Sequence, residues 1–186
     1  MTVKEKWDER YSDAPAEHGP AALLLDNAHL LSGGKALDAA MGLGNNAFFL
    51  SARGYEITGV DISPVAVSRV REHAEKNRLL IHAVAADLGQ FPVGKDVYDL
   101  IANFYYLDRT LIPQLKNGLK KNGLIFFETY TVAQRQFGGP SNPDYLLQPN
   151  ELLVLFLDFF IILYHERIVP GAQPRAIASL IAQKVC

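Results

Sequence analysis

The sequence has a single cysteine, Cys186, among its 186 residues. No internal disulfide and no zinc cluster of cysteines can therefore form, and we expect no metal site. An excess of charge of one sign is also lacking, because 18 lysines and arginines nearly balance 20 aspartates and glutamates. Without a basic run or stripe, nucleic acid is not an expected partner.

Long hydrophobic runs are missing as well. The most apolar stretch, residues 152–164, is interrupted by Asp158. It is also shorter than the roughly 20 residues that a membrane-spanning helix needs. The first residues are polar and lack the apolar centre of a signal peptide. The polar N-terminus, the short apolar runs and the presence of only one cysteine together predict a cytoplasmic protein with no membrane partner. No sequence pattern indicates an oligomeric state.

What is present is the composition of a folded domain, with 49% apolar and 20% charged residues. The length suits one hydrophobic core, so we expect a single domain over residues 1–186. Apolar runs and turn signals predict five strands, at 35–40, 55–60, 79–85, 98–103 and 124–129. Helices are predicted at 3–11, 21–31, 45–53 and 64–78, at a segment from Asp108 or Thr110 to about 121–123, and after Pro149.

Alternating strands and helices predict a parallel sheet with helices on both faces. Two further strand-like runs, residues 159–169 and 176–184, follow each other across a short turn and predict an antiparallel hairpin at the sheet edge. The expected fold class is therefore α/β. We predict a Rossmann-like, doubly wound sheet of seven strands, mostly parallel, with an antiparallel C-terminal hairpin.

The strongest motif is the glycine-rich segment 37–47, which follows the first predicted strand. Small residues at Ala40, Gly42 and Gly44 let the backbone turn tightly and approach a ligand closely. Asp38 lies near the end of a buried strand, where a charge is costly without a partner. A ligand-binding turn is one interpretation, and an ordinary strand–turn–helix connection with an internally paired aspartate is the other.

Polar residues also stand at the ends of the next three predicted strands. Asp61 can accept hydrogen bonds from both hydroxyls of a ribose, or can share a helix cap with Ser63. Asp87 can receive the amine of an adenine, or can form a turn. Asn103 precedes three aromatic residues in a row, of which at least one is expected to line a cleft, although core packing is an equal alternative.

These motifs, in this order, resemble those of class I S-adenosylmethionine-dependent methyltransferases. The similarity is strongest to small bacterial methyltransferases related to the tellurite-resistance methyltransferases. It rests on residues 38–47, 59–63, 86–88, 98–103 and 119–125, and segments 7–11 and 138–144 also resemble that subgroup. Two departures are Asn45, where relatives often carry arginine, and residues 174–179, which lack a histidine that some relatives carry.

The resemblance implies S-adenosylmethionine as the cofactor, a cofactor-binding core at residues 36–130, and an N-terminal lid at residues 1–20. Asp38 and the backbone of the glycine-rich turn would hold the methionine portion, Asp61 the ribose and Asp87 the adenine amine. Ile62 and Leu88 would flank the adenine, and the backbone near Asn103 would approach the reactive end. The full predicted cofactor-binding set is Asp38, Ala40, Gly42, Gly44, Asn46, Asp61, Ile62, Asp87, Leu88 and Asn103.

The resemblance implies methyl transfer to a small-molecule acceptor. For the acceptor pocket we predict Tyr11, His18, Tyr105, Tyr130 and Arg135. His18 can equally be an exposed loop residue, and for Arg135 a solvated side chain is the favoured alternative. No catalytic residue is assigned, because a general base is needed only when the acceptor is protonated.

Two other functions compete with methyl transfer. Gly42, Gly44 and Ala47 form a literal Gly-x-Gly-x-x-Ala, which is compatible with an NAD(P)-dependent oxidoreductase. Against that alternative stand the carboxylate of Asp38 inside the first strand and the absence of a second domain signal. The remaining alternative is a protein that binds the cofactor without catalysis.

Overall fold

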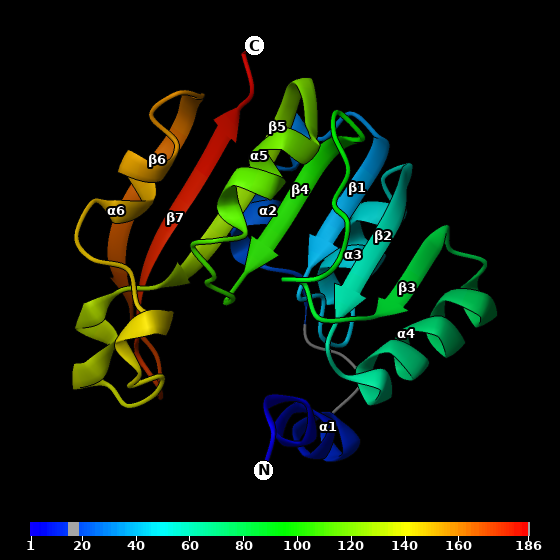
Figure 1. Ribbon diagram of the computed structural model, residues 1–186, viewed down its shortest axis with the longest axis horizontal. Helices are drawn as coiled ribbons and strands as arrows, with labels where there is room; N and C mark the ends of the chain where they lie inside the picture. The colour runs from blue at the N-terminus through cyan, green and yellow to red at the C-terminus, as the bar shows by residue number, and fades with distance from the viewer. Residues whose placement is uncertain (15–18, 186) are drawn as a thin grey trace.

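The computed structural model describes residues 1–14 and 19–185. A seven-stranded sheet runs through it in the order β3-β2-β1-β4-β5-β7-β6 (Figure 1). Strands β1 to β5 pair in parallel, and β7 pairs antiparallel with both β5 and β6. This confirms the predicted fold class. The strands are β1 (Gly34–Ala39), β2 (Tyr55–Asp61), β3 (Ile81–Ala85), β4 (Tyr98–Phe104), β5 (Leu119–Tyr130), β6 (Phe160–Val169) and β7 (Arg175–Gln183).

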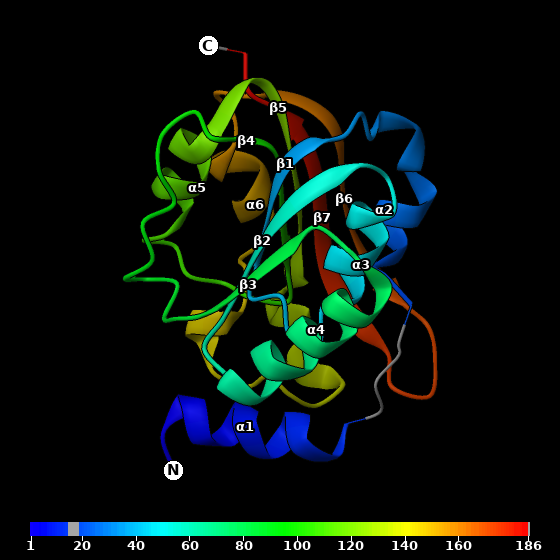
Figure 2. The ribbon, with the colours of Figure 1, turned by 90° about the vertical axis from the view of Figure 1, so that its right-hand side faces the viewer.

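Helices cover both faces of the sheet, with α2, α3 and α4 on one side and α5 and α6 on the other (Figure 2). Helix α1 lies beyond the carboxyl ends of β1 to β3, beside α4 (Figures 1 and 2). The α-helices are α1 (Val3–Asp13), α2 (Ala22–Asp26), α3 (Asn45–Ser51), α4 (Pro64–Asn77), α5 (Ile112–Gly118) and α6 (Glu151–Leu155). Short 3₁₀ segments are η1 (Ala28–Leu30), η2 (Val132–Gln136) and η3 (Pro143–Tyr145).

The central strands are apolar on both faces, as expected for a parallel sheet between two helical layers. Ala36 and Leu37 of β1 are both fully buried but belong to different core clusters, one on each side of the sheet. Leu100 and Ile101 of β4 divide in the same way. This double burial fixes β1 and β4 in the middle of the sheet. After β1 the chain continues to β2 on one side of this pair, and after β4 it continues to β5 on the other side. The carboxyl ends of β1 and β4 therefore form the switch point, at which such folds bind ligands.

Two predicted helices differ from the structure. The helix predicted at 21–31 is split into α2 and η1, because Asn27 leaves helical geometry at a φ of −114° and its side-chain amide donates to the carbonyl of Leu23. The helix predicted from Asp108 or Thr110 begins only at Ile112. There the Asp108 carboxylate accepts the Thr110 backbone N–H in a turn instead.

The fifth strand is longer than predicted, since it begins at Leu119 rather than at 124. Helix α5 ends at Gly118, whose missing side chain leaves room for Val93, and a Cβ there would stand 2.5 Å from that residue. Leu119 is then extended, is fully buried and pairs with Tyr98 at the start of β4. No helix in the described ranges is long and apolar enough to cross a membrane.

Candidate functional site

The glycine-rich turn joins the carboxyl end of β1 to α3. Three of its residues have left-handed backbones, with φ of 55° at Ala40, 54° at Gly42 and 79° at Gly44. A Cβ at Gly44 would stand 2.8 Å from Val70, and one at Gly42 would stand 2.9 Å from the hydroxyl of Tyr11. Conformation and close packing therefore both require glycine at these two positions.

Asp38 is the buried carboxyl beside this turn. It is 1% exposed, and its Oδ2 has no hydrogen-bond partner among the residues that the structure describes. Burial, and then the nearby charge of Asp61, raises the pKa of Asp38 to about 8, against the opposing effect of the Ala47 backbone N–H. A buried carboxyl oxygen without a donor is costly, so this site suits a ligand that brings a cation or an N–H group.

Asp61 connects the turn to the next strand. Its two carboxylate oxygens accept the backbone N–H of Gly42 at 2.8 Å and that of Ser63 at 2.9 Å. Burial raises the pKa of Asp61, the two N–H donors oppose that rise, and Asp8 adds to it. Each carboxylate oxygen can accept a second hydrogen bond, so Asp61 can hold the turn and still receive two hydroxyl groups.

Helix α1, at the N-terminus of the chain, packs against this site. The Ser63 hydroxyl donates to Asp8 of α1 at 2.5 Å, and the Arg69 guanidinium donates to the carbonyls of Tyr11 and Ala14 at 2.5 and 3.0 Å. Tyr11 lies against Gly42, and burial together with Asp61 raises the pKa of its phenol. The structure therefore brings Tyr11, predicted for the acceptor pocket, onto the predicted cofactor-binding turn.

The other predicted cofactor-binding residues lie along the same edge with different surroundings. Asp87 is exposed and accepts the Gly89 N–H at 2.9 Å, while Ile62 is half-buried. Leu88 is 4% exposed and packs into the core. Asn103 is 1% exposed, and its amide donates to the carbonyl of Tyr106 at 2.7 Å.

The side chain of Asn46 forms a hydrogen bond within the protein. Its Oδ1 accepts the backbone N–H of Ala21 at 2.9 Å, which ties the start of α3 to the segment before α2. This contact accounts for an amide at that position without any ligand.

A second polar group lies at the ends of β4, β5 and β7. Tyr105, with a left-handed φ of 58°, donates from its hydroxyl to Oε1 of Glu128 at 2.7 Å. The Arg175 guanidinium donates to the same hydroxyl at 2.6 Å. The rings of Tyr105 and Tyr130 lie 5.2 Å apart. Two of the tyrosines predicted for the acceptor pocket are thus brought together.

The remaining predicted acceptor residues do not join this group. Arg135 is exposed on η2, and its side chain makes no ion pair with the described part of the chain. His18 lies outside the described residues. The guanidinium that meets the tyrosines belongs to Arg175 instead.

Sequence reasoning missed Glu128, Ser179 and Arg175. Glu128 and Ser179 are polar residues inside apolar strands, 4% and 0% exposed, and this interruption of the apolar pattern is the signal that could have found them. Their pairing across β5 and β7 joins residues 51 positions apart, which no local pattern reveals.

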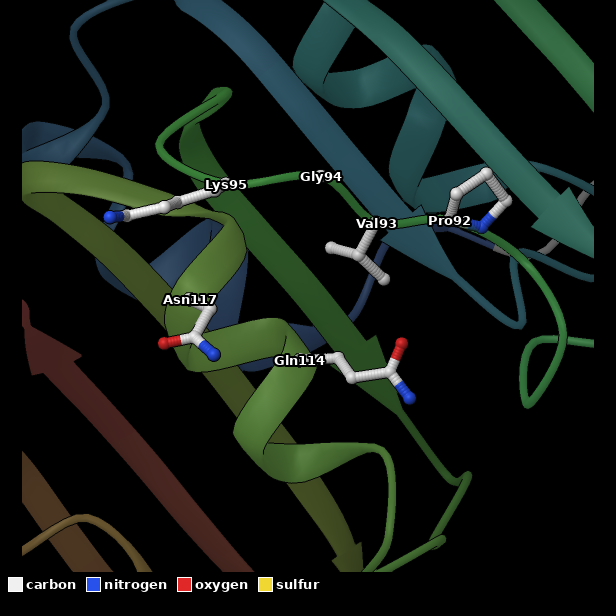
Figure 3. A pocket seen from close by; sticks show the side chains of 6 residues that line it. All are labelled: Pro92, Val93, Gly94, Lys95, Gln114 and Asn117. Carbon is white, nitrogen blue, oxygen red and sulfur yellow. The ribbon is translucent and has the colours of Figure 1, made fainter.

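A pocket on the surface lies away from these residues. Its volume is about 400 Å³, and it lies between the loop before β4 and α5 (Figure 3). Figure 3 shows Gln114 and Asn117 projecting from α5 beside that loop. None of the lining residues belongs to the predicted site, so this hollow does not locate the chemistry. No group of three metal-binding side chains occurs in residues 1–14 and 19–185.

Comparison with known proteins finds methyltransferases among the relatives of this chain. A family profile described as "Methyltransferase domain" matches residues 36–123. The probable S-adenosyl-L-methionine-dependent methyltransferase TehB of Haemophilus influenzae is 25% identical over 169 residues, which cover 88% of this chain. The chain is therefore similar to S-adenosylmethionine-dependent methyltransferases, and the match to the methyltransferase-domain profile is confined to residues 36–123. The chain spans 58% of the length of that TehB relative.

Solved structures of methyltransferases share the fold of this chain. TehB from H. influenzae superposes with a TM-score of 0.80 at 20% identity, covering 96% of this chain and 67% of that one. Geranyl diphosphate C-methyltransferase from Streptomyces coelicolor, solved with S-adenosyl-L-homocysteine, has a TM-score of 0.71 at 14% identity, covering 100% and 99%. S-adenosylmethionine is the cofactor named for the TehB relative, and the unpartnered oxygen of Asp38 at the glycine-rich turn is chemically suited to its ammonium group.

Proposed function

We propose that the chain transfers the methyl group of S-adenosylmethionine to a small-molecule acceptor. The observation that carries this proposal is the buried Oδ2 of Asp38, which lacks a donor beside a turn that only small residues can form. The ammonium of the cofactor would supply that donor. When bound, the cofactor supplies a sulfonium whose methyl group is already activated, so the protein contributes mainly orientation.

In this proposal residues 36–130 hold the cofactor, and the N-terminal lid, of which α1 is the described part, covers it. Asp38 receives the ammonium and Asp61 the ribose hydroxyls. The backbone at Ala40, Gly42 and Gly44 and that near Asn103 approach the methionine portion. Ile62 and Leu88 flank the adenine, and Asp87 receives its amine. The contacts of α1 with Ser63 and Arg69 support the lid.

The acceptor end is proposed at Tyr105, Tyr130 and Arg175. Helix α1 and the η2–η3 segment lie on two sides of the carboxyl edge of the sheet (Figure 1). The Arg175 guanidinium has no carboxylate within 4 Å in the described ranges, so it favours an acceptor that carries negative charge.

The strand order argues against the oxidoreductase alternative. Dinucleotide-binding sheets of the Rossmann type have the order 3-2-1-4-5-6. Here β7 is inserted antiparallel between β5 and β6, and the matched family is that of methyltransferases.

The test is methyl transfer from cofactor with a labelled methyl group to a panel of selenite, a small thiol and a small amine. We expect label in at least one product, and none with Asp38→Asn. If S-adenosylhomocysteine binds in calorimetry while no acceptor is labelled, the proposal of catalysis on these classes is wrong and the non-catalytic alternative gains support.

A further inference from the structure

We propose that Glu128 is a positioning residue, which fixes the hydroxyl of Tyr105, and through it the guanidinium of Arg175, at the acceptor end of the site. This inference rests on the proposed function, because it takes Tyr105 and Arg175 as the groups that meet the acceptor. Glu128 itself is 4% exposed and lies behind them.

The carboxylate of Glu128 is held from both sides. Its Oε1 accepts the hydroxyl of Tyr105 and its Oε2 accepts the hydroxyl of Ser179, each at 2.7 Å. Strand pairing places Glu128 of β5 directly opposite Ser179 of β7, so the sheet itself sets the carboxylate's location. A buried carboxylate that accepts two hydroxyl donors has little freedom to rotate.

Tyr105 is the residue on which this carboxylate acts. A left-handed backbone is strained for a residue with a side chain, and such strain persists only where surrounding contacts enforce it. Here the backbone N–H of Tyr105 donates to the carbonyl of Glu128 at 2.8 Å, in addition to the side-chain contact. Glu128 therefore holds Tyr105 by both its main chain and its side chain.

Arg175 is fixed by the same network and by one further residue. Its guanidinium donates to the hydroxyl of Tyr105. Its backbone neighbours are held by the buried Gln134, whose Oε1 accepts the N–H of Ala176 at 2.7 Å. The cation thus occupies a set location beside the end of β4, where the switch point of the sheet places bound ligands.

The consequence for the reaction is geometric. In-line methyl transfer depends on alignment, and a displacement of about 1 Å costs on the order of 100-fold in rate. Glu128→Gln keeps the shape but replaces one carboxylate oxygen by an N–H donor, which cannot accept from a hydroxyl. We expect the rate of transfer to fall by about 100-fold, with an unchanged Kd for S-adenosylhomocysteine.

The chain offers a matched control. Tyr164 donates from its hydroxyl to Glu166 at 2.6 Å, which is the same chemical pair on the edge strand β6. Glu166→Gln breaks an equivalent hydrogen bond away from the proposed acceptor end. We expect this variant to transfer methyl groups at the wild-type rate.

A first measurement needs no acceptor. Tyr105 faces Glu128, Arg175 and Tyr130, and burial and then Glu128 raise the pKa of its phenol. Comparing the ultraviolet titration of each protein with that of its Tyr105→Phe derivative isolates this residue. Tyr105 is expected to ionise at lower pH in Glu128→Gln than in the wild type. An unchanged ionisation would overturn the proposal.

The second measurement is transfer to selenite with labelled cofactor. A loss confined to Glu128→Gln, mostly in kcat and with the KM for the cofactor unchanged, supports positioning. Equal rates for Glu128→Gln and the wild type contradict it. If the wild type binds S-adenosylhomocysteine but does not methylate selenite, the choice of acceptor has failed rather than the role of Glu128, and the titration of Tyr105 decides that role.

Discussion

At the residue scale, the side chains that sequence motifs could locate are those at strand ends. Asp38, Asp61 and Asn103 were each predicted at the end of a strand, and the structure places them together at the carboxyl edge. Their roles toward a ligand remain predictions. The sequence could not indicate that Asp38 would be left with an unpartnered oxygen while Asp61 bonds the turn, because that difference depends on backbone N–H groups supplied by other segments.

Asp38 makes stability depend on pH in an unusual direction. Its pKa is raised to about 8 in the folded protein, so between the usual value of 3.8 and about 8 the unfolded chain is ionised while the folded chain stays protonated. The contribution of Asp38 to stability is therefore fully present below the usual pKa and is lost as pH rises through about 8.

Asp38→Asn removes this loss. We expect the difference in melting temperature between the ligand-free variant and the wild type to increase, in favour of the variant, as pH rises from about 5 to about 9. The increase should be roughly 2–4 °C for each kcal/mol of unfolding free energy that the wild type loses. Binding of S-adenosylhomocysteine should be abolished. Melting curves of both proteins across that range check the first point, and parallel pH profiles would contradict it.

Asp61→Ala tests a residue with two tasks. Removing the carboxylate leaves the backbone N–H groups of Gly42 and Ser63 without their acceptor, which costs about 1–3 kcal/mol for each group that stays buried. We expect a lower melting temperature and a weaker affinity for S-adenosylhomocysteine, by about 10- to 100-fold. Glu56→Ala, an exposed change on the same strand, is the control. Unchanged affinity in calorimetry would contradict the ribose assignment.

At the element scale, strand and helix periodicity predicted most of the order of elements. The failures lie where a tertiary contact overrides a local signal, as at Asn27, where a side chain ends α2, and at Leu119, where pairing with β4 draws the chain into β5 early. Helix α1 was predicted as a helix, but its docking on α4 depends on Arg69, 58 positions away from Tyr11.

Arg69→Ala should loosen α1. The variant loses hydrogen bonds from a charged group to the carbonyls of Tyr11 and Ala14, so the lid should open more often. We expect about tenfold weaker binding of S-adenosylhomocysteine, equal to 1.4 kcal/mol, and faster hydrogen exchange in α1. Arg71→Ala is the matched control, because Arg71 is on the same helix but donates to Ala83 of β3. Equal exchange in both variants would show that Arg69 does not hold the lid.

At the scale of the whole molecule, alternation of strands and helices predicted the doubly wound sheet and its antiparallel end. The pairing that builds the proposed acceptor end could not be predicted from the sequence, because Tyr105 and Arg175 meet at a separation of 70 residues through strands that are not neighbours in sequence. Long-range pairing of this kind is set by packing of the complete sheet rather than by any local motif.

The complete fold should respond to its cofactor product and not to a dinucleotide. At a concentration 100 times its Kd, S-adenosylhomocysteine should stabilise the protein by about 2.7 kcal/mol. That corresponds to a rise in melting temperature of roughly 5–10 °C for a chain of this size. NAD at the same concentration should cause no rise. Stabilisation by NAD alone would reverse the choice between the two functions.

The position of β7 has a consequence for synthesis. Residues 175–183 form an inner strand, flanked by β5 and β6, although both of those strands precede it in the chain. During synthesis on the ribosome, β5 and β6 therefore have unpaired edges until β7 emerges. Unpaired strand edges make a partly synthesised chain prone to aggregation. The glycine-rich turn and its carboxylates emerge much earlier. A nascent chain can thus complete the half of the molecule that carries the proposed cofactor site before the half that carries the proposed acceptor end exists.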